Sequence, residues 1–111
     1  MNILFICSRN QWRSPTAEAV WRKIPGLNVR SAGTSPKAKK SVSATDIQWA
    51  DVVFVMESKH NQRLMANFGK LLKHKQPIVL NISDDYKFMD PELVEILETE
   101  AEQFLERQEK D

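Results

Sequence analysis

Residues 2–22 constrain the fold more than any other segment, because a short apolar run meets a helix start across a tight loop. Ile3–Ile6 form an apolar run that is typical of a strand covered on both faces, as in a parallel sheet. Ser14 followed by Pro15 resembles a helix start, with Ser14 as the N-cap and proline at the first helical position. The segment therefore predicts a strand, a loop and a helix in direct succession.

The loop between that strand and helix holds Cys7 and Arg13, with five residues between them. A loop that leads onto a helix N-terminus directs several backbone N–H groups at one point, with the positive end of the helix dipole behind them. Such a loop can hold a dianionic phosphate. The same field stabilises a thiolate at Cys7, which makes it a nucleophile, and Arg13 can donate to two phosphoryl oxygens at once.

Composition limits the alternatives. The chain has 111 residues, which predicts one domain over residues 1–111. Sixteen Lys and Arg residues against 15 Asp and Glu residues give a net charge of +1, so we expect neither a nucleic acid nor a membrane as a partner. No signal-like segment or long apolar stretch is visible, and we expect a cytoplasmic location. The single cysteine excludes an internal disulfide and a multi-cysteine metal cage, and we expect no metal or other cofactor.

The remaining elements follow from periodicity and from capping residues. Strands are predicted over residues 27–30, 52–56 and 78–80, with residues 31–34 as the exit loop of the first of these and residues 34–43 as a polar loop. Helices are predicted over about 15–23, after a cap at Ser43, from a cap at Ser58 to Gly69, and from a cap at Asp90 to near the end of the chain. His60 is interpreted as a polar residue in the first turn of its helix.

The motif Cys7-x5-Arg13-Ser14 after an apolar strand resembles the phosphate loop of cysteine-dependent protein phosphatases. Pro15-Thr16-Ala17-Glu18-Ala19 and Ser31-Ala32-Gly33-Thr34 look like the low-molecular-weight protein tyrosine phosphatases, in a short variant that lacks a helix near residues 34–43. The resemblance implies a single three-layer α/β domain, flavodoxin-like or Rossmann-like, with a four-stranded parallel sheet flanked by helices and the phosphate loop after strand 1.

Residue by residue, the resemblance implies a catalytic set of Cys7, Arg13 and Asp84, in which Asp84 is the general acid. It implies a phosphate-binding loop made of Ser8, Arg9, Asn10, Gln11, Trp12, Arg13 and Ser14. Asn10 would brace this loop, the Ser14 hydroxyl would stabilise the thiolate, and Ser31 would support the loop from outside. Asp85 stands where the family has proline. Asp85 and Tyr86 are predicted to support the site, and Asp85 is the second candidate for the general acid.

The expected activity is that of a metal-independent phosphomonoesterase, in the first place a protein tyrosine phosphatase acting through a phosphocysteine. Its substrate would be a phosphorylated protein or a small aryl phosphate, and we expect a monomer. Asn10-Gln11-x-Arg13-Ser14 also resembles the phosphatase of the RNA polymerase II tail, which keeps phosphoserine or phosphothreonine as an alternative. A phosphate- or phosphoprotein-binding module with little turnover is a further alternative. In this chain Arg9 replaces a family glycine and adds a cation near the phosphate, and Trp12 replaces a second cysteine.

Overall fold

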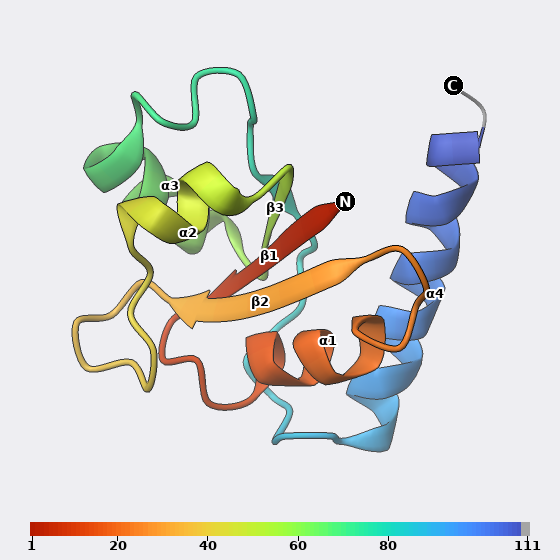
Figure 1. Cartoon of the computed structure of the whole chain (residues 1–111). Helices are drawn as coiled ribbons and strands as arrows, with labels where there is room; N and C mark the ends of the chain where they lie inside the picture. Colours follow the sequence, from red (N-terminus) through yellow and green to blue (C-terminus); the bar gives the residue numbers. More distant parts are fainter. Residues whose placement is uncertain (110–111) are drawn as a thin grey trace.

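A computed structural model describes residues 1–109 of the chain as four strands and four helices in alternation (Figure 1). In chain order these elements are β1 (Asn2–Cys7), α1 (Arg13–Trp21), β2 (Asn28–Gly33), α2 (Ala44–Trp49), β3 (Val52–Val55), α3 (Ser58–Phe68), β4 (Ile78–Val79) and α4 (Pro91–Glu109). No helix within the described range is long and apolar enough to cross a membrane.

The four strands form one parallel sheet in the order β2-β1-β3-β4. Helices α1 and α4 cover one face of this sheet, and α2 and α3 cover the other (Figure 1). This arrangement confirms the predicted three-layer α/β fold. Because the chain runs from β1 to β2 on one side and then crosses to β3 on the other, the carboxyl end of β1 lies at the switch point where open α/β sheets bind ligands.

The central strand β1 separates two hydrophobic clusters. Ile3, Phe5 and Cys7 face the cluster that includes Trp21 of α1 and residues of α4. Leu4 and Ile6 alternate with them and face the cluster built on α2 and α3. Residues 3–7 are therefore buried on both faces of the sheet, as the apolar run predicted. Cys7 is the last strand residue, and its side chain leaves the sheet at the edge where the loop begins.

The prediction that Ser14 caps the first helix was wrong. Helix α1 begins at Arg13 with Trp12 in the N-cap position, and no side chain bonds to its first free N–H groups. The Ser14 hydroxyl is engaged with Cys7 instead. The start of α1 thus leaves its backbone N–H groups unoccupied by the chain's own side chains, which suits an external anion.

Two further boundaries differ from the prediction. Ser31, Ala32 and Gly33 belong to β2 rather than to an exit loop, because they pair with β1 as far as Cys7 opposite Gly33. Helix α3 has Glu57 as its N-cap, so Ser58 is its first helical residue and not its cap.

The caps predicted for the other helices are confirmed. Ser43 and Asp46 form a reciprocal capping box at α2, and Gly69 is the C-cap of α3. At α4, the Asp90 carboxylate accepts from the Glu92 N–H at 2.9 Å.

Candidate active site

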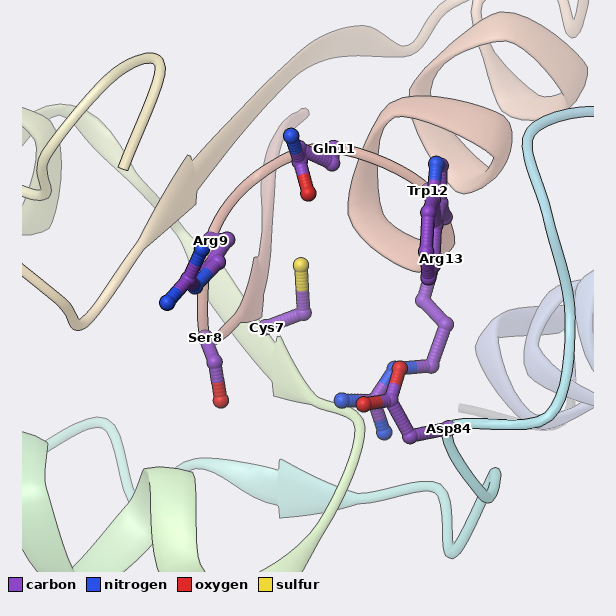
Figure 2. Close-up of a pocket in the computed structure, with 7 residues that line it drawn as sticks. All are labelled: Cys7, Ser8, Arg9, Gln11, Trp12, Arg13 and Asp84. Atoms are coloured by element: carbon purple, nitrogen blue, oxygen red, sulfur yellow. The ribbon is translucent and has the colours of Figure 1, made fainter. Parts of the chain in front are cut away.

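The loop between β1 and α1 curves around the sulfur of Cys7 (Figure 2). Its outer side is held by the segment that follows β2, since the carbonyl groups of Cys7, Ser8 and Arg9 accept from the N–H groups of Thr34, Ser35 and Lys39 at 2.9, 2.9 and 3.0 Å. The backbone N–H groups of residues 8–12 have no acceptor within residues 1–109. They are free to bind an anion above Cys7.

Two local features give the loop this shape. Asn10 adopts φ = +55°, the left-handed region that asparagine tolerates better than most residues. Gly33 lies directly behind the loop: a Cβ there would stand 2.5 Å from the Ser8 carbonyl oxygen and 2.6 Å from the Ala38 Cβ. Only glycine permits this close approach.

The Cys7 sulfur, 3 % exposed, lies 2.9 Å from the Ser14 hydroxyl oxygen. Asn10 Nδ2 donates to Ser14 Oγ at 3.0 Å and to Ser31 Oγ at 2.9 Å, and the Ser31 hydroxyl donates to Glu18 Oε1 at 2.6 Å. Ser14 Oγ accepts from Asn10, and its own proton can point to the Cys7 sulfur at 2.9 Å or to the Ala32 carbonyl oxygen at 3.4 Å. A chain of hydrogen bonds thus runs from Glu18 through Ser31, Asn10 and Ser14 to the Cys7 sulfur.

Arg13 is almost fully buried and is anchored on one side. Its Nη1 donates to Glu57 Oε1 at 2.5 Å and to the Ile82 carbonyl at 2.8 Å, and its Nε lies 3.5 Å from Asp84 Oδ1. Burial raises the pKa of Glu57, but the hydrogen bond and charge of Arg13, with smaller contributions from Lys59 and His60, outweigh this and lower it below its ordinary value. Glu57 is therefore an anion that fixes the guanidinium from below.

His60 completes the underside of the loop. Its Nδ1 accepts from the Glu57 N–H at 3.0 Å, which leaves the proton on Nε2, and Nε2 lies 2.9 Å from Ser8 Oγ. Burial and the nearby Arg13 charge lower the pKa of His60 from 6.5 to about 4. His60 lies in the first turn of α3 as expected. Its contact with the phosphate loop was missed, because Ser8 lies 52 residues away in the sequence.

A cavity of about 260 Å³ opens above Cys7. The side chains that line it are Cys7, Ser8, Arg9, Gln11, Trp12, Arg13 and Asp84 (Figure 2). Asn10 and Ser14 are buried behind the loop rather than in the cavity wall. The Arg9 side chain points away from the Cys7 sulfur, so the expected additional cation is not directed at the centre of the cavity (Figure 2).

The three residues that follow Ser83 take different positions. Asp84 lies at the mouth of the cavity beside Arg13, with 60 % of its side chain exposed. Asp85 is not among the lining residues and accepts from the Ser83 hydroxyl at 2.8 Å. Tyr86 packs against the core cluster on the α1 and α4 face rather than in the cavity wall. Of the two carboxylates, Asp84 is the one placed to reach a bound molecule.

Comparison with known proteins gives a consistent result. Residues 2–46 match the family described as low molecular weight phosphotyrosine protein phosphatase. A protein-arginine-phosphatase of Bacillus subtilis (strain 168) is 31 % identical in an aligned region that covers 63 % of this chain and 65 % of the relative. The chain thus spans just under two thirds of the length of this curated relative.

Solved structures share the fold over nearly the whole chain. The YwlE arginine phosphatase of Geobacillus stearothermophilus superposes with a TM-score of 0.74 at 22 % identity, covering 98 % of this chain and 96 % of that one. A low molecular weight protein tyrosine phosphatase of Streptococcus pyogenes gives a TM-score of 0.77 at 18 % identity, with 96 % and 91 % covered. These likenesses show that the chain has the fold of the low-molecular-weight protein tyrosine phosphatases, and its residues 2–46 match that family in sequence.

Proposed function

We propose that this chain is a metal-independent phosphatase that hydrolyses phosphorylated proteins through a phosphocysteine at Cys7. One observation carries the proposal. The Cys7 sulfur lies 2.9 Å from the Ser14 hydroxyl oxygen, inside a loop whose N–H groups at residues 8–12 have no acceptor within residues 1–109. This arrangement stabilises a sulfur anion and a phosphoryl group at the same point.

In the first step, the Cys7 thiolate attacks phosphorus in line with the leaving group. An S–P bond forms, the bond from phosphorus to the leaving oxygen breaks, and the carboxylic acid form of Asp84 gives that oxygen its proton. The loop N–H groups and Arg13 hold the three equatorial oxygens as charge redistributes over them. Glu57 keeps the guanidinium in place because it bonds to Nη1.

In the second step, water attacks the phosphocysteine. Asp84, now a carboxylate, takes a proton from the water, the S–P bond breaks, and the electron pair returns to the Cys7 sulfur. The Ser14 hydroxyl stabilises the departing thiolate from 2.9 Å. Inorganic phosphate leaves, and Asp84 is again protonated for the next cycle.

For the substrate, we propose phosphotyrosine first, because Trp12 at the cavity wall gives an aromatic ester a flat surface. Phosphoarginine is the second candidate, since the curated relative is named a protein-arginine-phosphatase and the exposed Asp84 carboxylate can accept from a guanidinium. Phosphoserine lacks a planar group that could use the Trp12 surface.

Hydrolysis of p-nitrophenyl phosphate in excess chelator tests the reaction. We expect turnover by the unmodified chain, no turnover by Cys7→Ser, and a loss of about 10²–10⁴-fold in kcat for Asp84→Asn. Asp85→Asn is the matched comparison, and its loss should be far smaller because Asp85 does not line the cavity. Tight phosphate binding without turnover would identify a binding module instead.

Side-by-side assays of peptides that carry phosphotyrosine, phosphoarginine or phosphoserine at one position test the substrate. We expect the highest kcat/KM for phosphotyrosine. A higher kcat/KM for the phosphoarginine peptide would mean that this chain shares the activity named for the relative, and it would overturn the tyrosine proposal. Quenching a single turnover and finding added phosphate on Cys7 by mass spectrometry tests the covalent intermediate independently of the substrate.

A further inference from the structure

We propose that a groove beside the phosphate cavity, with Trp12, Pro15 and Phe88 in its wall, binds an apolar side chain of the protein substrate close to the phosphorylated residue. This inference rests on the proposed function, since it assigns the groove to the same substrate. We call this feature the Trp12–Phe88 groove.

The groove lies where apolar side chains are exposed. Five large apolar residues are exposed within residues 1–109, and two of them line the groove, Trp12 at 41 % and Phe88 at 53 %; a third, Met89 at 39 %, follows Phe88 in the chain. The first belongs to the phosphate loop and the other two to the segment before α4. Exposed apolar side chains that gather beside a cavity are typical of a binding surface rather than of a solvated one.

Backbone contacts hold Phe88 in this exposed position. The Met89 N–H donates to Thr16 Oγ1 in α1 at 2.9 Å, and the Asp90 N–H donates to the Lys87 carbonyl at 3.1 Å. Met89 has φ = +62°, a region that residues with a side chain rarely occupy. The turn is thus tied to α1, the helix that follows the phosphate loop, and Phe88 lies with Trp12 in the wall of the groove.

The groove, of about 420 Å³, adjoins the phosphate cavity, because Gln11 and Trp12 line both. When the phosphate of a substrate residue lies above Cys7 and its chain leaves the cavity over Trp12, the neighbouring residue, about 3.8 Å further along the backbone, comes within reach of the groove. Polar residues also line the groove, namely Asn10, Gln11, Glu18, Ser31 and Lys39, and Glu18 already accepts from Ser31. The apolar part of its wall is made by Trp12, Pro15 and Phe88, and the exposed rings of Trp12 and Phe88 favour an apolar occupant such as leucine.

The wall that the groove shares with the phosphate cavity also favours a substrate segment over a second copy of the chain as the occupant of the groove. A second copy seated in the groove would cover Trp12, which is a wall of the phosphate cavity, and would obstruct the site. A substrate segment enters and leaves with each turnover and has no such conflict.

Binding by the Cys7→Ser variant tests the proposal without turnover. Two phosphotyrosine peptides are compared by fluorescence anisotropy, identical except for leucine or serine beside the phosphotyrosine. We expect about tenfold tighter binding of the leucine peptide. Adding Phe88→Ser should reduce this preference to less than threefold and leave the Kd of the serine peptide unchanged. Ile78→Thr, which alters an apolar side chain of similar exposure in β4, is the matched control and should keep the preference.

Kinetics with p-nitrophenyl phosphate, which has no peptide chain, give the second measurement. With Cys7 intact, Phe88→Ser should keep kcat/KM for this small ester within twofold and raise KM for the leucine peptide. Equal affinity for the two peptides, an equal loss with both, or a dimer in light scattering that Phe88→Ser dissociates would overturn the groove proposal. Failure of the unmodified chain to hydrolyse p-nitrophenyl phosphate would overturn the catalytic proposal instead, while the affinity comparison still decides the groove.

Discussion

Protonation of His60 should destabilise this protein as the pH falls below neutrality. The ring is 1 % exposed, its Nδ1 is occupied by the Glu57 N–H, and Arg13 and Lys59 oppose a further positive charge, while Glu57 and Asp84 favour it. Burial is the largest of these effects, and the pKa of His60 is about 4 in the folded chain against 6.5 for an ordinary histidine. The folded state therefore binds fewer protons at His60 than the unfolded state does between these two values.

The free energy of unfolding follows from this difference. The contribution of the neutral ring is fully present above pH 6.5 and is lost as the pH falls toward 4, because the unfolded chain takes up the proton first. A difference of this size corresponds to a loss of about 1 kcal/mol by pH 5.5 and about 2–3 kcal/mol by pH 4.5, relative to pH 7.5. For a domain with a stability of about 5–15 kcal/mol, this is a measurable share of the free energy of unfolding.

Urea unfolding at pH 7.5, 6.5, 5.5 and 4.5, followed by tryptophan fluorescence, measures the effect. The unmodified chain is compared with His60→Gln, so that groups which titrate in both proteins cancel. The stability advantage of the unmodified chain should shrink by about 2–3 kcal/mol between pH 7.5 and 4.5. His74→Gln alters the other histidine, which is exposed, and should reproduce the curve of the unmodified chain. A constant difference between the unmodified chain and His60→Gln across this range would refute the reasoning.

Three further predictions concern the supports of the site. Gly33→Ala places a Cβ 2.5 Å from the Ser8 carbonyl oxygen. We expect the free energy of unfolding, measured by thermal unfolding, to fall by about 1–3 kcal/mol and kcat for p-nitrophenyl phosphate to fall more than tenfold. An unchanged kcat would mean that β2 does not shape the loop. Glu57→Gln removes the anion bonded to Arg13 Nη1 but keeps a side chain of the same shape, and kcat/KM should fall by about tenfold with unchanged circular dichroism, whereas Ser58→Ala should keep it. Phe104→Ala removes an aromatic ring whose centroid lies 5.6 Å from that of Trp21 and 5.5 Å from that of Phe54. The free energy of unfolding in urea should fall by about 3–5 kcal/mol, and by less for Phe104→Leu. A loss below 1 kcal/mol would show that α4 is not anchored through this ring.

Local patterns were sufficient to locate the strands and helices, and the family resemblance supplied the fold class. Each strand and helix could be located from its own residues, since apolar runs, capping residues and proline positions act over a few neighbours. Where boundaries were missed, a distant partner decided them. Ser31–Gly33 became strand because β1 lies alongside them, and Ser14 does not cap α1 because its hydroxyl contacts the Cys7 sulfur.

The residues of the candidate site also fall into two groups, those that could be predicted from the sequence and those that only the fold brings to the site. Cys7 and Arg13 could be predicted because strand, loop and helix are consecutive, and Asp84 was found through the family resemblance. Glu18 was missed, because its importance lies only in its bond to Ser31 across the space between α1 and β2. The choice between the adjacent Asp84 and Asp85 also needed the fold, since only Asp84 lines the cavity.

By itself, the sequence determined the strand, the phosphate loop and the helix that bring a thiol to a helix N-terminus, because all three are formed by residues that are close in the chain. Only the tertiary structure decided what surrounds that thiol and its arginine. Glu57 reaches Arg13 from 44 residues away and His60 reaches Ser8 from 52, because parallel strands end at one edge of the sheet whatever their separation in sequence. The pKa shifts of Glu57 and His60 depend on burial and on the Arg13 charge, both of which arise from that meeting, and no local pattern contains it.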